Sequence, residues 1–237
     1  MRFRGGDGMR NALRIVYDDR DITVCEKPIG VLSEASEDQP SMIALLTEYY
    51  QNQNSGAVPY PLHRLDLAVG GLMVYAKNKT AASVLSRDIA EGRFDKGYFA
   101  AVAGDIEAAL GKEGELFDYL FKDSRQNKVF AVKKKRQGVK EARLRYTLVG
   151  KATVDGEVLS LLFITLLTGR SHQIRVQLSS RGFPLYGDGK YGSRHKGEIA
   201  LFSARLAFTH PKTKEATVFS LPLPERAPFS YFTEVTV

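Results

Sequence analysis

The chain has very little cysteine and no long apolar run. Cys25 is the only cysteine among 237 residues, so an intramolecular disulfide is impossible and a cysteine-based zinc site is excluded. This cysteine lies in an apolar, strand-like run at 22–25, where a small buried thiol is the ordinary expectation. The longest apolar run, at 158–167, falls short of the roughly 20 residues that a membrane-spanning helix needs. We therefore expect a cytoplasmic protein with no membrane partner.

The N-terminus lacks the apolar centre of a signal peptide. Residues 1–12 are rich in Gly and Arg, and we expect them to form a flexible arm. Over the whole chain, 34 Lys and Arg residues outnumber 27 Asp and Glu residues, which gives a net charge of +7. Such an excess favours an anionic partner, of which nucleic acid is the commonest.

Strand patterns outnumber helix patterns. Apolar, β-branched runs at 13–17, 22–26, 71–76, 98–102, 158–167, 199–208 and 216–221 predict strands, and helical spacing at 41–50, 79–91 and 172–180 predicts helices. The elements do not alternate regularly as strand, helix, strand. This favours an α+β fold with a mixed, largely antiparallel central sheet flanked by helices. No repeat or linker is apparent, so we expect one catalytic domain over 13–237.

The first segment that indicates chemistry is PLHRLDLAVGGL at 61–72. It places Asp66 beside His63 and Arg64, just before a pair of glycines and a buried strand. Glycine at such a position allows another backbone or a substrate to approach closely. A structural Asp in a turn is the alternative interpretation.

The second segment is RFDKGYFA at 93–100. Lys96 and Tyr98 should share one face of a strand, because side chains alternate between the two faces. The tyrosine offers a flat ring for stacking and a hydroxyl for proton transfer. Ordinary packing of an aromatic ring within a sheet is the competing interpretation.

The third segment is LTGRSHQIRVQL at 167–178. It leads from the apolar strand into a helix, with Thr168 or Ser171 as a possible N-cap. A helix N-terminus attracts anions, and Arg170 and Arg175 offer paired donors for phosphate or carboxylate. A further basic run, KKKR at 133–136, lies between two strand-like segments and could equally be a solvated hairpin.

Taken together and in this order, the three segments resemble the signature of the RluA-like family of pseudouridine synthases. That family has His-Arg-Leu-Asp, then Lys-x-Tyr, then Thr-Gly-Arg-x-His-Gln-Ile/Leu-Arg. The motifs at 15–18, 27–30, 184–188 and 191–192 agree as well, so the resemblance covers roughly 13–224. One departure is visible, since the family usually has Thr-Ser-Gly where this chain has Val-Gly-Gly at 69–71. No S4-type RNA-binding extension is expected.

The resemblance implies an isomerase that converts uridine to pseudouridine in structured ribosomal or transfer RNA, at a central active-site cleft and without cofactor or metal. Asp66 would be its essential carboxylate, either attacking C1′ of the ribose or removing the C2′ proton. Arg175 would pair with Asp66. Tyr98 would stack on the target base and could transfer a proton at C5.

Other basic residues would contact or position the RNA. A buried target base must leave its stack, and Arg64 is the residue expected to occupy the vacated place or to bind phosphate. Backbone contacts are expected from Lys96, Arg170 and the three lysines Lys133, Lys134 and Lys135, with His63 beside them. We expect a monomer with no obligate protein partner.

Other enzyme classes fit the sequence less well. A glycoside hydrolase needs a second carboxylate about 5–10 Å from the first, and no paired acidic motif is apparent. A metal nuclease needs clustered ligands, whereas the four histidines are scattered. A serine hydrolase needs a Gly-x-Ser-x-Gly turn, which the chain lacks. The alternative that stays open is a catalytically silent RNA-binding protein on the same scaffold.

Overall fold

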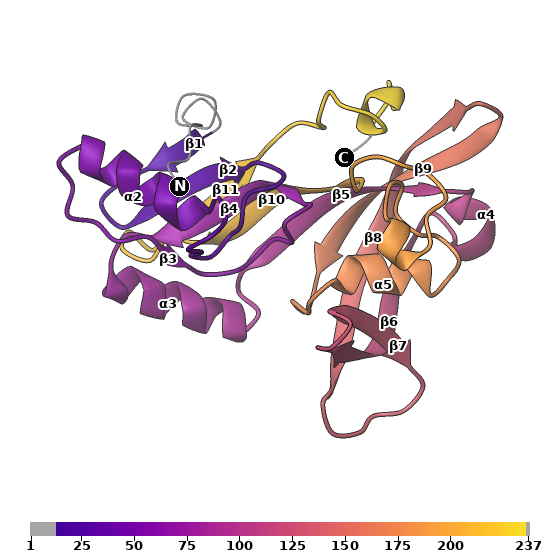
Figure 1. Cartoon of the computed structure of the whole chain (residues 1–237), viewed down its shortest axis with the longest axis horizontal. Helices are drawn as coiled ribbons and strands as arrows, with labels where there is room; N and C mark the ends of the chain where they lie inside the picture. The colour runs from indigo at the N-terminus through magenta and orange to yellow at the C-terminus, as the bar shows by residue number, and fades with distance from the viewer. Residues whose placement is uncertain (1–12, 236–237) are drawn as a thin grey trace. The chain divides into compact units, whose positions relative to one another are not determined.

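The computed structural model describes residues 13–235 (Figure 1). The flexible arm expected at 1–12 lies outside the described residues. The chain forms two compact units, residues 13–94 with 203–221 and residues 95–202 with 222–235. We call them unit 1 and unit 2. The expected single domain and its central cleft stay predictions.

Unit 1 is built on a sheet in the order β1-β2-β4-β10, with β11 paired to β10 and β3 paired to β4. Its elements are β1 (Arg14–Asp18), β2 (Ile22–Lys27), α2 (Met42–Asn52), β3 (Tyr60–Pro61), β4 (Gly70–Ala76), α3 (Lys79–Ala90), most of β10 (Leu201–Thr209) and β11 (Ala216–Ser220). The strands predicted at 13–17 and 22–26 are confirmed, and β1 and β2 pair antiparallel as a hairpin. Strand β4 is buried along its whole length, which explains its continuous apolar pattern.

The helices of unit 1 begin where their sequences predict. Ser41 caps α2 at the start of the predicted helix, because its hydroxyl accepts a hydrogen bond from the Ala44 N–H at 3.2 Å. Asn78 caps α3 in the same way through the Ala81 N–H, at 2.9 Å. Leu85 of α3 is fully buried, so the predicted apolar face of this helix packs inward.

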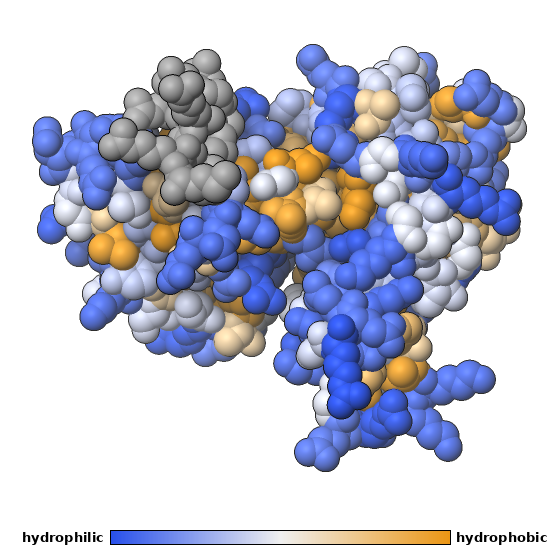
Figure 2. All heavy atoms as spheres, in the orientation of Figure 1, coloured by the Kyte–Doolittle hydropathy of each residue, from blue (hydrophilic) through white to orange (hydrophobic). Residues whose placement is uncertain are grey.

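Unit 2 is an antiparallel sheet in the order β5-β9-β8-β6-β7. Its elements are β5 (Asp95–Ala103), α4 (Ile106–Leu110), β6 (Glu113–Asp123), β7 (Lys128–Val132), β8 (Val139–Val154), β9 (Glu157–Leu166), α5 (Gln173–Ser179), η1 (Gly189–Tyr191) and η2 (Phe229–Tyr231). Strands β6 and β7 lie at the lower end of the unit in Figure 1. Figure 2 shows mostly hydrophilic side chains there, with some apolar atoms among them. The predicted α+β class with a largely antiparallel sheet is confirmed.

Helix α5 packs on one face of the unit 2 sheet. Val176 joins Leu120 of β6 and Val129 of β7 in a buried apolar cluster. The fully buried Gln177 amide donates to Asp118 Oδ2 at 2.8 Å and lies 3.3 Å from the Leu116 carbonyl oxygen. The helix is therefore fixed to the sheet by apolar packing and by buried hydrogen bonds.

The start of α5 differs from the sequence prediction. Neither Thr168 nor Ser171 caps the helix, because the N-cap residue is His172, in the left-handed region with φ +51° and without a side-chain cap hydrogen bond. The Thr168 hydroxyl instead donates to the Gln173 Oε1 at 2.9 Å, and that same oxygen accepts from the Arg170 N–H at 3.0 Å. The Gln173 side chain thus holds together the loop that precedes the helix.

Candidate active site

The loop between β3 and β4 carries Asp66 and is held on both sides of it. The Ser33 hydroxyl bonds to both the N–H and the carbonyl oxygen of Leu65, each at 3.0 Å. On the other side, the Leu67 carbonyl oxygen accepts from the Gly30 N–H at 2.9 Å. The Asp66 side chain is half-buried. Its backbone is therefore fixed before any substrate binds.

The glycine pair that follows is required by a close backbone approach. A Cβ on Gly71 would lie 2.2 Å from the carbonyl oxygen of Ser203, and the residue has φ +117°. The Ser203 hydroxyl also donates to the Leu72 carbonyl oxygen at 2.9 Å. Close approach at this pair was a sequence prediction, and at Gly71 the approaching group is the backbone of β10.

A buried lysine lies beneath the Asp66 loop. The Lys27 ammonium donates to the carbonyl oxygens of Val31 at 2.7 Å and Pro28 at 2.9 Å, and lies 3.5 Å from that of Leu67. The side chain is fully buried. Burial lowers the pKa of Lys27 to about 8, and the negative charge of Asp66 acts in the opposite direction. Lys27 is thus a buried cation within electrostatic reach of Asp66.

His63 and Arg64 have different surroundings in the same loop. His63 Nε2 accepts from the Val74 N–H of β4 at 3.4 Å, and its ring lies 5.9 Å from that of Phe94. His63 therefore ties the loop to β4. Arg64 is exposed and pairs with the exposed Glu34 at 3.2 Å, a type of surface contact that contributes little to stability.

Unit 2 brings the second and third sequence segments together. Lys96 and Tyr98 lie two residues apart on β5, so they share a face as predicted, and Tyr98 is 5% exposed. A Cβ on Gly169 would lie 3.3 Å from the Lys96 ammonium nitrogen. Burial lowers the pKa of Lys96. The Lys-x-Tyr strand and the Thr-Gly-Arg loop therefore meet at this ammonium.

Arg175 forms a bidentate ion pair with Asp188. Its Nε donates to Asp188 Oδ2 at 2.7 Å and its Nη2 to Oδ1 at 2.9 Å, and both side chains are buried. In the sequence, Asp188 was marked only as part of the matching motif at 184–188. The pairing expected between Arg175 and Asp66 would join the two units, and it stays a prediction.

The remaining basic residues lie around β8. Arg170 Nε donates to the carbonyl oxygen of Glu141 at 2.9 Å. The Glu141 carboxylate binds the ammonium of Lys135 at 3.0 Å, which raises the pKa of Lys135. Lys133 and Lys134 are exposed in the turn that joins β7 to β8. The structure therefore connects both Arg170 and Lys135 to Glu141.

Two features are absent from residues 13–235. Within them, no group of three or more His, Cys, Asp or Glu side chains is placed to hold a metal ion. Over the same range, none of the helices has the length and apolarity to cross a membrane. The expected independence from cofactors stays a prediction.

Comparisons with known proteins identify the family. A family model described as RNA pseudouridylate synthase matches residues 21–180. An uncharacterized RNA pseudouridine synthase of Aquifex aeolicus (strain VF5) is 33% identical over 229 residues, covering 90% of this chain and 70% of the relative. The dual-specificity RNA pseudouridine synthase RluA of Vibrio parahaemolyticus is 30% identical over 217 residues, covering 84% of this chain and 78% of the relative.

A solved structure agrees at the level of the fold. Human RNA Pseudouridylate Synthase Domain Containing 4 matches with a TM-score of 0.75 and 19% identity, covering 94% of each chain. The family model spans more than half of the chain, and the Aquifex relative covers most of it. This protein therefore belongs to the RluA-like family of RNA pseudouridine synthases, which are isomerases.

Proposed function

We propose that this chain isomerises specific uridines in structured ribosomal or transfer RNA, with Asp66 as the reacting carboxylate. The observation that carries the proposal is the Asp66 loop. It presents one half-buried carboxylate on a backbone held by Ser33 on one side and by Gly30 on the other. A carboxylate on a backbone that is fixed in advance loses less freedom when the substrate binds, which lowers the barrier to its reaction.

The chemistry needs one such group. The C1′–N1 bond breaks, the uracil turns, and a bond forms between C1′ and C5. Asp66 either attacks C1′ and is later displaced, or removes the C2′ proton to give a glycal-like intermediate and returns that proton. In both routes the C5 proton must leave after the new bond has formed, and N1 must gain one. The isomerisation has no net redox change and needs no external nucleophile.

Two residues of unit 2 complete the proposed machinery. Tyr98 supplies a ring for the target base to stack on and a hydroxyl that could carry the C5 proton. Arg175 is proposed to pair with Asp66 as well as with Asp188. A guanidinium has five N–H donors, and Asp188 engages the Nε and one Nη2 donor. The pair with Asp188 fixes the direction in which the guanidinium points.

The RNA backbone is proposed to be held by cationic side chains. Arg64 is exposed, and we propose that it fills the place that the target base leaves or binds an adjacent phosphate. Lys96, Arg170 and the lysines at 133–135 are proposed phosphate contacts, and His63 is proposed to hold the loop that presents Arg64. Such contacts supply affinity without reading the base sequence.

The enzyme is further proposed to act in the cytoplasm, as a monomer and without an obligate protein partner. The single cysteine is buried in β2, and the excess of basic residues suits an RNA substrate. A catalytically silent RNA-binding protein is the alternative, and activity measurements separate the two.

The test is tritium release from RNA labelled at C5 of uridine, because formation of the C1′–C5 bond expels that hydrogen. Wild type should release tritium. Asp66→Asn should lower the rate by more than about a thousandfold, equivalent to about 4 kcal/mol, while RNA affinity in a filter-binding assay changes little. Asp38→Asn is the matched control, since it makes the same change at an exposed aspartate of unit 1.

The outcomes are distinct. Release by wild type and by the control, but not by Asp66→Asn, supports the proposal. Binding without release in wild type would identify a silent RNA-binding protein. An Asp66→Asn rate within about tenfold of wild type would exclude Asp66 as the essential carboxylate.

A further inference from the structure

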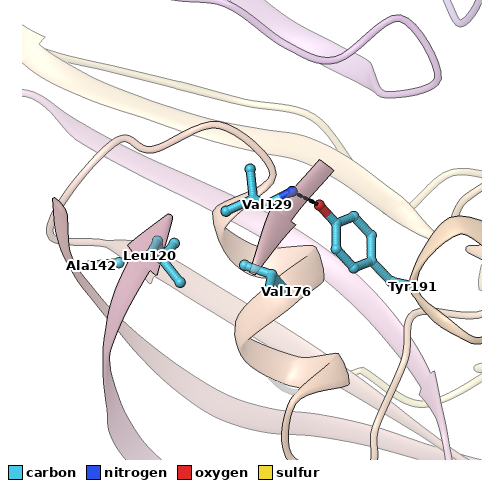
Figure 3. Packing of buried hydrophobic residues seen from close by; sticks show 5 residues of the cluster. All are labelled: Leu120, Val129, Ala142, Val176 and Tyr191. Carbon is cyan, nitrogen blue, oxygen red and sulfur yellow. Dashed lines mark hydrogen bonds between the residues drawn. The ribbon is translucent and has the colours of Figure 1, made fainter. Parts of the chain in front are cut away.

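Tyr191 belongs to a buried apolar cluster in unit 2. It ends the short η1 turn and is 6% exposed. Its neighbours in the cluster are Leu120, Val129, Ala142 and Val176, which come from three strands and from α5 (Figure 3). The ring therefore packs where the β6–β7–β8 part of the sheet meets the helix that carries Arg175.

The hydroxyl of Tyr191 connects two further elements. It accepts the backbone N–H of Val129 on β7 at 2.9 Å, as Figure 3 shows. It also lies 2.8 Å from His172 Nδ1, at the N-cap of α5. One phenol oxygen thus ties β7 to the start of α5. These two hydrogen bonds hold the hydroxyl end of the ring in place.

The face of the same ring supports cations. The Arg175 guanidinium carbon lies 5.0 Å from the ring centroid, and the Lys128 ammonium lies 5.5 Å from it. These distances are typical of cation–π contacts. Asp188 holds one edge of the Arg175 guanidinium, but a carboxylate at one edge leaves the guanidinium plane able to tilt. A flat ring against its face removes that freedom.

We propose that Tyr191 is a positioning residue for Arg175 in the isomerisation. Its ring sets the plane of the guanidinium, and its hydroxyl fixes the ring to β7 and to the α5 cap. The inference rests on the proposed function, because it requires Arg175 to act on Asp66 or on substrate. It follows that the reaction rate depends on a hydroxyl that itself takes no part in the chemistry.

The central variant is Tyr191→Phe, which keeps the ring and removes its ties to Val129 and His172. The matched control is Tyr146→Phe. Tyr146 is also buried in unit 2, and its hydroxyl also makes a short bond, to the Leu110 carbonyl oxygen at 2.7 Å. Tyr191→Phe loses two hydrogen bonds and Tyr146→Phe loses one, so the melting temperatures of the two variants show how much of any rate difference is a loss of stability.

The measurement is the single-turnover rate of tritium release at saturating enzyme, alongside RNA affinity and melting temperature. Tyr191→Phe should lower the rate roughly ten- to a hundredfold, which is the scale expected for a small misplacement of a reacting group. RNA affinity should change less than about threefold. Tyr146→Phe should keep the wild-type rate. Equal rates for the two variants would overturn the proposal.

A double-mutant cycle identifies Arg175 as the residue through which Tyr191 acts. Arg175→Lys removes the flat group that the ring supports, so adding Tyr191→Phe to that background should lower the rate less than about threefold further. Full multiplication of the two single effects would show that Tyr191 acts independently of Arg175 and would refute the proposal. If wild type makes no pseudouridine, the proposed function itself fails, and that result appears before any variant is compared.

A second measurement needs no variant to fold. Protons of a guanidinium that lies over the face of an aromatic ring resonate upfield of those in solvent-exposed arginines. In wild-type protein with labelled arginine, the Arg175 signals should therefore be shifted upfield relative to those of the exposed Arg145. Unshifted Arg175 signals would show that the ring does not support the guanidinium, whatever the fate of Tyr191→Phe.

Discussion

The buried Lys27 predicts how the stability of this protein changes with pH. Its pKa falls from 10.5 in the unfolded chain to about 8 in the fold, chiefly because of burial. Between these two values the unfolded state binds more protons than the folded state, so the free energy of unfolding rises with pH. Below pH 8 Lys27 is protonated in both states, so it does not change how the free energy of unfolding depends on pH. The stabilising window therefore opens near pH 8, on the alkaline side.

The size of the effect follows from the width of the window. One pH unit within it corresponds to about 1.4 kcal/mol, so between pH 8 and 9.5 Lys27 alone should contribute up to about 2 kcal/mol to the free energy of unfolding. Burial raises the pKa of Cys25, so this thiol opposes the gain in wild type, but its effect cancels when wild type is compared with Lys27→Met. Measurements should stop near pH 9.5. Burial raises the pKa of Tyr50 and Tyr75, so at higher pH these tyrosines stay protonated in the fold, ionise in the unfolded chain and produce the opposite slope.

The assay is urea unfolding at pH 7, 8, 9 and 9.5 for wild type and for Lys27→Met. The variant leaves the carbonyl oxygens of Pro28 and Val31 without their donor, which costs stability at every pH and cancels from the slope. Between pH 8 and 9.5, the free energy of unfolding of wild type should rise relative to that of Lys27→Met by up to about 2 kcal/mol. The negative charge of Asp66 raises the pKa of Lys27, so in Asp66→Asn the gain should begin at a lower pH.

Two results would refute this reasoning. A difference between wild type and Lys27→Met that stays constant from pH 7 to 9.5 would show that Lys27 keeps an ordinary pKa in the fold. An Asp66→Asn profile that coincides with wild type would show that the Asp66 charge is not felt at Lys27. The second result would leave the buried lysine in place but separate it from the site.

Three further predictions concern the site and its support. Tyr98→Phe should keep RNA affinity and slow tritium release; a parallel loss of both would indicate a structural tyrosine. Replacing the three lysines at 133–135 by Ala should flatten the dependence of log affinity on log salt by up to about 0.7 per lost phosphate contact. Glu141→Gln is the control, because it frees Lys135 from its ion pair. An unchanged slope in the triple variant would indicate a solvated turn. Gly71→Ala should destabilise the fold by about 3 kcal/mol or more in urea unfolding, because its Cβ would overlap the Ser203 carbonyl oxygen; a loss below about 1 kcal/mol would contradict that contact.

Local sequence patterns predicted the local features of this fold. Residues close together in the chain determine strands β1 and β2, helix α2 and the shared face of Lys96 and Tyr98. Backbone period and turn chemistry decide such features. The family signature then placed Asp66, Tyr98 and Arg175 in one reaction, although composition and spacing alone assign no role to any of them.

Features that depend on distant residues were missed. Lys27 follows an apolar strand and precedes a proline, and nothing nearby in the sequence shows that its ammonium points at the carbonyl oxygens of two loops. Asp188 lies 13 residues from Arg175, so their pairing is not a helical spacing. Strand β6 alternates polar and apolar residues so irregularly that only its pairing with β7 and with β8 defines it.

The charges of the site are balanced within each unit, and this affects how any loss of activity should be interpreted. A buried guanidinium without a partner would cost several kcal/mol, but Arg175 keeps its bidentate bonds to Asp188 whatever happens to Asp66. Lys27 likewise keeps its carbonyl partners in unit 1. Neutralising Asp66 therefore leaves neither buried cation without hydrogen-bond partners. Inactivity of Asp66→Asn would then reflect the lost carboxylate rather than a loss of the hydrogen bonds that hold Arg175 and Lys27.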